Sequence, residues 1–390
     1  MNLNLDRSEW KWVTFGDVVE QSKEKVDPTD GTVSRVIAGE HMDSNDLKIH
    51  RWGSVDGGYL GPAFHRRFRP GQVLYGSRRT YLRKVAVADF DGVCSNTTFV
   101  LSSKDENRLL PGFLPWVMTS EPFHAFAIAE SKGSVNPYVN FSDIARYEFA
   151  LPPLDQQQRI ADLLWAVETH LEAQRNTNAV ASQLERWLVI RTLDLPGTIF
   201  KLQEVGDVLM GRQRAPQYAT GDNIVPYLRV ANIGDNKLRL DDVKEMNFDP
   251  REAEQYRLQA DDILVSEGQS RELVGQAARI EKITRTICFQ NTLIRFRPDR
   301  SLIHPEFAFA LVRALFYSGH FASLASQTTS IAHLGVKRFA TCKVPVPTAR
   351  VQMRRLEQIQ VTQKAVAAVA NVISQESSLR RSLLQEVFSS

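Results

Sequence analysis

Several loops of the sequence carry cations or amides next to small residues, a combination that could contact phosphates and base edges of a nucleic acid. Lysine and arginine pair with phosphate oxygens, whereas amide and hydroxyl side chains exchange hydrogen bonds with bases. Gly76 and Gly268 adjoin two of these loops and would let the backbone approach a phosphate. We predict contacts from Ser77, Arg78, Arg79, Tyr81, Arg83, Lys84, Ser134 and Asn136 in the first half, and from Arg212, Arg214, Gln269, Ser270, Arg271, Thr328, Thr329, Ser330 and His333 in the second.

The cations are unevenly distributed along a chain whose net charge is only +3. Residues 1–195 carry 22 Lys and Arg against 25 Asp and Glu, and residues 196–390 carry 26 against 20. The stretches 66–84 and 307–356 each contain seven basic residues and no acid. Such stretches favour a polyanionic partner over a small neutral one. For either stretch alone, a solvated surface with acidic partners from elsewhere in the fold is an equally open interpretation.

Catalytic arrangements find little support in the residue pattern. Asn136-Pro137-Tyr138 has one proline where the amino-methyltransferase motif has two, and no glycine-rich loop follows a strand as a cofactor site requires. Asp241-Asp242 and Asp261-Asp262 are paired carboxylates without a well-placed lysine, so we interpret them as solvated turn acids rather than a nuclease centre. No Ser, Cys or His nucleophile has convincing spacing. We predict no catalytic residue and no cofactor.

The composition and the cysteines predict a folded protein of a reducing compartment. The chain is 43% hydrophobic and 24% charged, and Cys94, Cys288 and Cys342 are far apart and form no CxxC pair. We expect small buried thiols, and no metal site because no histidine cluster has ligand spacing. No run approaches the length of a membrane span, and residues 1–12 lack the apolar segment of a signal peptide. These features predict a cytoplasmic protein without membrane contact.

An internal repeat organises the chain. Phe68–Tyr75 reappears as Leu258–Val265, and Gly16 aligns with Gly206 at the same offset. Later matches drift slightly in offset but keep their order, which indicates duplication with small loop insertions. These matches pair Cys94 with Cys288, Pro111 with Pro305, Leu151-Pro152 with Val346-Pro347, Gln157 with Gln352, and Arg159 with Arg354.

Each half divides into a mixed segment and a long amphipathic segment. Short apolar runs such as 85–88, 224–225 and 293–296 predict strands, and residues 111–129 and 305–325 predict helices that each open at a proline. After Leu151-Pro152-Pro153, a long helix begins with Asp155 as candidate N-cap. The polar stretch 174–178 predicts a kink or a break in its apolar seam.

The two long segments are expected to pair. About 38 residues of helix reach ~57 Å at 1.5 Å per residue, and apolar intervals of three and four residues suit packing of helix on helix. We predict an α+β fold in which two similar mixed α/β domains (1–152 and 196–347) are separated by two long antiparallel helices (153–195 and 348–390), with a pseudo-two-fold internal duplication. The predicted pairing and docking residues are Ile160, Leu164, Val167, Leu171, Leu184, Leu188, Leu356, Ile359, Val366, Ile373 and Leu384.

This organisation resembles the specificity subunit of Type I restriction–modification systems over the whole chain. The stretch Glu148-Phe-Ala-Leu-Pro-Pro-Leu-Asp-Gln-Gln-Gln-Arg-Ile160 is similar to the junction between domain and helix in that family. Phe68–Ser77 and Gly133–Tyr138 are similar to segments of the recognition domains. The second junction departs from the pattern, because Val344-Pro-Val-Pro347 is followed by fewer glutamines.

The resemblance implies a non-catalytic, DNA-binding subunit with two target-recognition domains. Each domain would read one half of a bipartite, asymmetric double-stranded DNA target, and the helix pair would set the gap. Two methyltransferase (modification) subunits would dock on the helices, and restriction (endonuclease and translocase) subunits would join them. Two alternatives stay open: a helical adaptor that binds protein partners, and the specificity component of a system with a fused nuclease–methyltransferase.

Overall fold

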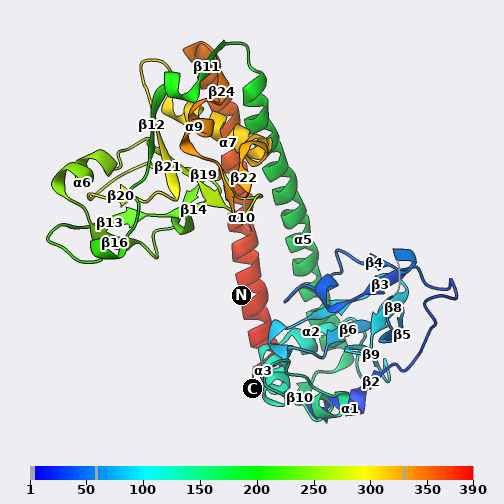
Figure 1. The fold of residues 1–390 in the computed structure, drawn as a ribbon. Helices are drawn as coiled ribbons and strands as arrows, with labels where there is room; N and C mark the ends of the chain where they lie inside the picture. Colours follow the sequence, from blue (N-terminus) through cyan, green and yellow to red (C-terminus); the bar gives the residue numbers. More distant parts are fainter. Residues whose placement is uncertain (1–4, 58–59, 328–330, 390) are drawn as a thin grey trace. The chain divides into compact units, whose positions relative to one another are not determined.

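The computed structural model describes residues 5–57, 60–327 and 331–389 (Figure 1). The chain divides into two compact units: unit 1 comprises residues 1–175 and 371–390, and unit 2 comprises residues 176–370. Each unit combines a mixed α/β domain with part of two long helices, α5 (Leu154–Ile190) and α10 (Ala349–Phe388). The domain boundaries predicted at 152, 195 and 347 stay predictions, because the compact units divide the chain within the helices.

Unit 1 contains two four-stranded sheets and a two-stranded sheet. Their strand orders are β2-β9-β6-β7, β4-β3-β8-β5 and β1-β10. All pairs are antiparallel except β3 with β8. The elements before α5 are β1 (Lys11–Thr14), α1 (Phe15–Val18), β2 (Val19–Gln21), β3 (Arg35–Ile37), β4 (Gly53–Ser54), β5 (Phe64–Phe68), β6 (Val73–Gly76), β7 (Val85–Val87), β8 (Gly92–Ser95), β9 (Thr98–Ser103), α2 (Leu114–Thr119), α3 (Glu121–Ala129), α4 (Phe141–Ile144) and β10 (Glu148–Leu151).

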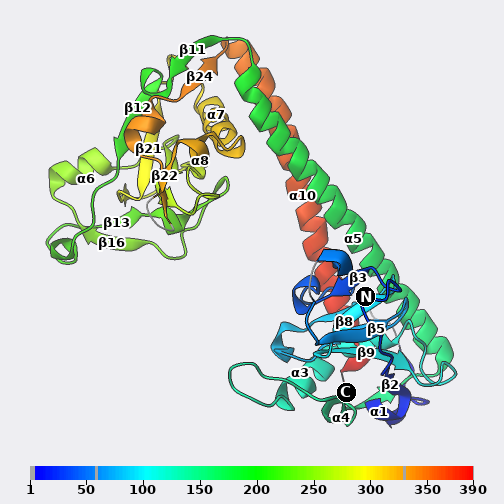
Figure 2. The ribbon, with the colours of Figure 1, turned by 45° about the vertical axis from the view of Figure 1, so that its right-hand side comes forward.

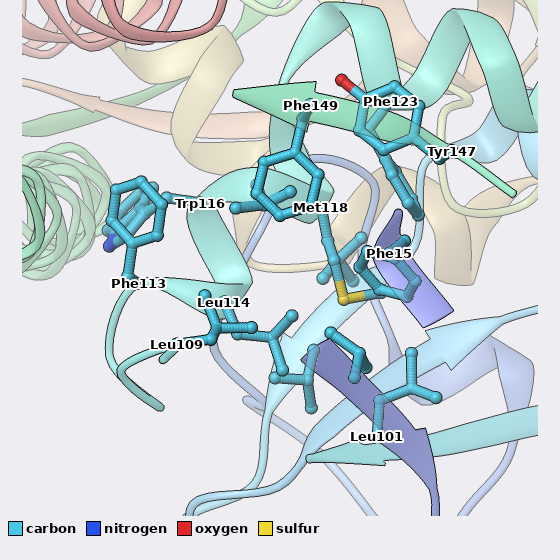
Figure 3. Close-up of a cluster of buried hydrophobic side chains, with 14 of the residues drawn as sticks. Phe15, Leu101, Leu109, Phe113, Leu114, Trp116, Met118, Phe123, Tyr147 and Phe149 are labelled. Carbon is cyan, nitrogen blue, oxygen red and sulfur yellow. The ribbon is translucent and has the colours of Figure 1, made fainter. Parts of the chain in front are cut away.

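Strand β6, inside the first sheet of unit 1, is buried on both faces, which explains its apolar run Val73–Tyr75. Val73 and Tyr75 of β6 belong to the main core of the unit. Trp116 of α2 and Phe123 of α3 enter the same core (Figure 3). Leu74, between Val73 and Tyr75, points to the other face and packs with residues of the second four-stranded sheet. Side chains alternate along a strand, so a strand between two cores is apolar at every position.

The first sheet of unit 2, β12-β21-β17-β19, repeats the strand order of the first sheet of unit 1. The sheets of unit 2 are β12-β21-β17-β19, β16-β13-β20, β11-β24, β14-β15 and β18-β23-β22. Ile263 and Val265 of β17 face the core with α7, and Leu264 faces the second sheet. The elements are β11 (Thr198–Lys201), β12 (Gly206–Met210), β13 (Ile224–Leu228), β14 (Ile233–Gly234), β15 (Lys237–Leu238), β16 (Lys244–Asn247), α6 (Pro250–Tyr256), β17 (Ile263–Ser266), β18 (Gly268–Gln269), β19 (Ala277–Arg279), β20 (Cys288–Phe289), β21 (Leu293–Pro298), α7 (Pro305–Tyr317), α8 (His320–Leu324), β22 (Ser326–Gln327), β23 (Ala332–His333), α9 (Val336–Ala340) and β24 (Lys343–Val346).

The strand pairing corrects two alignments of the sequence repeat. Val19 pairs with Ser103 as Gly206 pairs with Pro298, so Gly206 corresponds to Val19 and not to Gly16. Likewise Cys94 of β8 pairs with β3 in parallel, and the residue at the same position in the pairing of β20 with β13 is Phe289, not Cys288. Local residue identity had favoured the wrong register, whereas hydrogen bonding and side-chain direction determine the correct one.

Both mixed-domain helices predicted as single segments are interrupted. The first divides into α2 and α3 at Ser120, whose extended backbone and hydroxyl cap the new helix start. The second divides into α7 and α8 at Gly319, which has a left-handed φ of 76°. Periodicity alone does not reveal such breaks, because the apolar face continues across them.

The long helices differ from their predicted details. α5 begins at Leu154, so Asp155 lies in the first turn instead of acting as N-cap. In the first turn its negative charge still interacts favourably with the helix dipole. The helix is continuous through residues 174–178, and the kink or break in its apolar seam stays a prediction. In each unit α5 and α10 lie side by side and run antiparallel (Figure 2). Within the described ranges, no helix combines the length and apolar character needed to cross a membrane.

Burial lowers the pKa of His124 in α3 to about 4. Neither ring nitrogen has a hydrogen-bond partner among the described residues. The unfolded chain, with a histidine pKa near 6.5, therefore takes up the proton first as the pH falls. We expect unit 1 to lose about 3 kcal/mol of stability between about pH 6.5 and pH 4. Urea unfolding across this range checks the loss, which His124→Leu should remove; an equal pH dependence in the variant would contradict it.

Candidate nucleic-acid interface

Two loops of unit 1 that the sequence analysis singled out lie against each other. These recognition loops, residues 77–84 and 131–139, are joined by backbone hydrogen bonds from Arg79 N to Pro137 O (2.6 Å) and from Val139 N to Ser77 O (3.1 Å). Arg78 and Tyr138 also form an antiparallel bridge. The fold thus brings together cationic and amide residues that are far apart in the sequence.

The exposed side chains of these loops contact one another. Arg79 Nε donates to Asn136 Oδ1 at 2.9 Å, and the Arg78 guanidinium lies 4.8 Å from the centre of the Tyr138 ring. Arg79 and Arg83 both adopt a left-handed backbone, with φ of 50° and 51°. Such conformations cost energy in residues with a Cβ and cluster at functional sites. Gly76, Arg78, Lys84 and Thr98 line an adjoining hollow of about 300 Å³.

The second loop of unit 1 projects an exposed tip. Ser134 and Asn136 are exposed and flank Val135, which is 90% exposed. The base of the loop is anchored, because Lys132 Nζ lies 2.9 Å from both carboxylate oxygens of Asp143. Backbone hydrogen bonding at Asn140 and the Lys132 side chain hold the pKa of Asp143 below its usual value. The anchor therefore stays charged at neutral pH.

The remaining candidates of unit 1 are not equally available. Tyr81 is exposed, but Arg83 forms a bidentate pair with Glu121 at 2.7 Å and Lys84 binds the Gly39 carbonyl. Ser77 is buried and donates to the Thr97 carbonyl at 2.7 Å. Its hydroxyl is used within the fold, so we leave Ser77 out of the proposed contact surface.

Unit 2 repeats the arrangement at the corresponding strands. β18 pairs with β23, and Leu334 N donates to Glu267 O at 2.8 Å. Gly268 is thereby paired with His333 and Gln269 with Ala332, and His333 Nδ1 lies 3.0 Å from Glu267 Oε2. Ser270 follows Gln269, and Arg271 is exposed. The predicted contacts Thr328, Thr329 and Ser330 lie outside the described residues.

Arg212 and Arg214 lie on another loop of unit 2, after β12. Arg212 is buried, stacks on Tyr218 at 3.7 Å from the ring centre and pairs with Glu252 at 2.6 Å. It also donates to the Asn247 carbonyl. Arg212 thus stabilises the interior and is unavailable to a ligand, whereas Arg214 is exposed.

Acidic residues neutralise part of the basic stretch 66–84. Arg67 pairs with Asp91 at 2.6 Å and Arg69 with Glu24 at 2.7 Å. The Arg67 side chain lowers the pKa of Asp91, and Arg69 lowers that of Glu24. Only the later part of the stretch, from Arg78 onward, contributes cations to the recognition loops.

Asp241 and Asp242 are exposed in a turn, as predicted, whereas Asp261 and Asp262 are held in ion pairs within the fold. Asp262 is buried, accepts the Gln259 N–H and pairs with Arg297 at 2.7 Å. Asp261 pairs with Arg279 at 2.6 Å. In the part of the chain that the structure describes, no group of three or more His, Cys, Asp or Glu is arranged to hold a metal ion. The three cysteines are buried, as predicted.

The predicted helix residues fall into three groups. Ile160, Leu164 and Leu384 pack on the domain core of unit 1, and Leu356 packs on that of unit 2. Leu184 is 47% exposed and forms a strip on α5 with the exposed Val180 and Trp187. The buried Leu171 and Ile359 and the half-buried Val167, Leu188, Val366 and Ile373 make up the rest.

Sequence analysis missed the role of one repeated residue, the buried Gln157. Its Oε1 accepts the Leu110 N–H at 2.9 Å, and its Nε2 donates to the carbonyls of Arg108 and Pro152 at 2.9 and 2.8 Å. Gln352 likewise accepts from His304 N and donates to Pro347 O. Each glutamine joins the start of a long helix to its domain by hydrogen bonds. The match of Gln157 with Gln352 in the repeat was the sequence signal that could have indicated this role.

Comparison with known proteins finds relatives for the first half of the chain. Residues 7–180 match the family described as Type I restriction modification DNA specificity domain. The specificity subunit of the Type I restriction enzyme EcoDI from Escherichia coli is 30% identical over 175 residues, 44% of this chain and 38% of that protein. The chain spans less than half the length of the curated relatives it matches.

Two solved structures share the fold over nearly the whole chain. One, from work on complex assembly and conformational transition of the type I R-M system, has a TM-score of 0.62 with 22% identity and covers 97% of both chains. The Type I restriction–modification S subunit from M. genitalium has a TM-score of 0.57 with 16% identity and covers 100% of this chain and 98% of that one.

The fold comprises two mixed α/β domains and the two long helices α5 and α10, parts of which belong to each unit. Each domain presents a pair of loops that carry cations and amides. Over residues 7–180 the chain is similar to the DNA specificity domain family of Type I restriction–modification systems. The resemblance inferred from the sequence is thereby confirmed over residues 7–180.

Proposed function

We propose that this chain is the DNA-reading subunit of a Type I restriction–modification complex. Each domain recognises one half of a bipartite, asymmetric target in double-stranded DNA. The chain itself carries no catalytic residues, and the chemistry belongs to its partners. The two domains arose by duplication and then diverged, so they read unlike half-sites.

One observation carries this proposal: equivalent strand positions in both units present the predicted loops together. Backbone hydrogen bonds join Ser77 to Val139 in unit 1 and Glu267 to Leu334 in unit 2. Exposed Arg78, Arg79 and Asn136 supply cations and an amide in the first, and Gln269 and Arg271 do so in the second. Cations bind phosphates and fix the position on DNA, whereas amides and bidentate arginines read base edges.

The helix pair has two roles in this proposal: it sets the gap between half-sites, and it docks two methyltransferase subunits that restriction subunits join. The exposed strip of Val180, Leu184 and Trp187 supports a protein-binding role for α5. The same strip favours the second candidate, an adaptor that binds only proteins. The adaptor differs from the proposed subunit in lacking sequence-specific DNA binding in any assembly.

Methylation mapping tests the proposal. The chain is co-expressed with the methyltransferase encoded by the neighbouring gene, and methylated adenines are mapped across the host genome. A bipartite, asymmetric motif with a fixed gap is the expected result. Co-purification of the two proteins without any methylated motif would favour the adaptor.

Removing the two exposed arginines of the first recognition loop should weaken DNA binding and its dependence on salt. We expect Arg78→Ala with Arg79→Asn to reduce the slope of log K against log salt by up to about two units, because each phosphate contact contributes about one. Asparagine suits position 79 because it tolerates a left-handed backbone. The slope is measured for the complex with its methyltransferase.

Arg146→Ala is the matched control, because Arg146 is exposed but already paired with Glu130. It should leave the salt slope unchanged. A double variant with the wild-type slope would place Arg78 and Arg79 outside the phosphate contacts.

A further inference from the structure

Two carboxylates of α5 are buried where this helix meets α10. In unit 1, Glu168 is 1% exposed, pairs with Arg380 of α10 and lies 3.4 Å from Arg175 Nη1. In unit 2, Glu185 is 8% exposed, and its Oε1 accepts from Gln363 Nε2 of α10 at 3.0 Å. The same oxygen lies 2.9 Å from Arg313 Nη1 of α7.

The two contacts share one helix register. Glu168 and Glu185 are as many residues apart on α5 as Gln363 and Arg380 are on α10. The contact in unit 1 and the contact in unit 2 therefore specify the same antiparallel alignment of the helices.

The contacts also occupy equivalent positions of the internal repeat. The offset in residue number that relates Gln157 to Gln352 in the repeat also relates Glu168 to Gln363, and Glu185 to Arg380. One ancestral contact is thus present twice, with an ion pair in one copy and an amide–carboxylate hydrogen bond in the other. The helices consequently carry unlike groups at equivalent positions.

Buried polar contacts of this kind contribute more to specificity of pairing than to stability. An ion pair removed from water gains little over apolar residues of similar volume, whereas an unpaired buried charge is strongly unfavourable. A slip of α10 by one turn would bring Glu376 or Leu384 opposite Glu168 in place of Arg380. Either neighbour removes the Arg380 partner and leaves the buried carboxylate with Arg175 of its own helix alone, so the slipped register is penalised. A polar residue in an apolar helix seam fixes register in coiled coils for the same reason.

Each contact extends into the domain of its own unit. Arg380 also donates to the Asn45 carbonyl at 3.3 Å, and Arg175 lies 3.7 Å from Asp46. In unit 2, Arg313 belongs to α7 of the domain core. The register of the helices is therefore linked to the placement of each domain on them.

We propose that Glu168 and Glu185 are positioning residues that hold α5 and α10 in a single register and so fix the number of base pairs between the half-sites. This inference rests on the proposed function of the helix pair. One helical turn advances about 5.4 Å and one base pair about 3.4 Å, so a slip of one turn corresponds to one or two base pairs.

The test removes the polar contacts while keeping the seam filled. The full chain with Glu168→Leu, Arg380→Leu and Gln363→Leu leaves the Glu185–Arg313 pair intact. It is co-expressed with the methyltransferase, and methylated adenines are mapped. We expect unchanged half-sites, and at least a tenfold rise over wild type in methylation at sites whose gap differs by one or two base pairs. Glu357→Gln, on an exposed position of α10, is the control and should keep the single gap.

A charge exchange distinguishes the contact from general packing. Glu168→Arg alone should reduce methylation at sites with the wild-type gap. Adding Arg380→Glu should restore methylation at those sites. Should the apolar variant be insoluble, Glu168→Gln with Gln363→Leu is mapped in the same way.

A single wild-type gap in the soluble contact-free variant would overturn the inference, because apolar packing would then suffice to set the register. Failure of the charge exchange to restore the gap would also overturn it. Absence of any bipartite motif with the wild-type chain is a separate result, which contradicts the proposed function itself.

Discussion

Lengthening both long helices by four residues should lengthen the gap between half-sites by one or two base pairs and leave the half-sites unchanged. The insertions follow Asn176 in α5 and Asn371 in α10, so on each helix the insertion falls between the residues that form the two polar contacts. Four residues add about 6 Å of helix, just over one turn. Methylation at the original sites should fall at least a hundredfold, and new sites with the longer gap should appear in the adenine map.

An insertion in α5 alone is the informative control. It would prevent Glu168–Arg380 and Glu185–Gln363 from forming together, so we expect loss of methylation at every site instead of a new gap. If lengthening both helices changed the bases of a half-site, the helices would take part in base reading and the division between domains and helices would be wrong.

Replacing Gln157 by leucine should destabilise unit 1 by roughly 2–4 kcal/mol. Its side chain is buried and makes three hydrogen bonds to the backbone of Arg108, Leu110 and Pro152. Leucine fills the space but leaves those backbone groups without partners, at a cost of about 1–3 kcal/mol for each group that water cannot reach. Because the chain has two compact units, we expect two transitions in urea unfolding, and the transition of unit 1 should move to a lower urea concentration in the variant.

Two matched variants serve as controls for Gln157→Leu. Gln352→Leu removes two hydrogen bonds instead of three and should cost less. Gln158→Leu replaces an exposed neighbour that contacts Asp162, and should change stability by less than about 0.5 kcal/mol. Equal midpoints for Gln157→Leu and Gln158→Leu would show that Gln157 does not hold the helix to the domain.

Much of the candidate interface could be predicted because loop chemistry is local. Arg78, Arg79 and Asn136 were selected by residue type and small neighbours, and the structure places them together in exposed loops. Ser77 and Arg212 have the same local signals but are buried. Their burial depends on chain segments distant in sequence, such as Thr97 for Ser77 and Glu252 for Arg212.

The sequence by itself determined the repeated order of the elements, the position of the long helices and the loops that carry cations and amides. These features follow from periodicity, prolines and residue type, which act over a few residues. Tertiary structure alone decided the register of the repeat at Val19 and Phe289, the break at Gly319, and the pairing of Glu168 with Arg380. Those features depend on which distant groups become partners once water is excluded, and no local pattern encodes that choice.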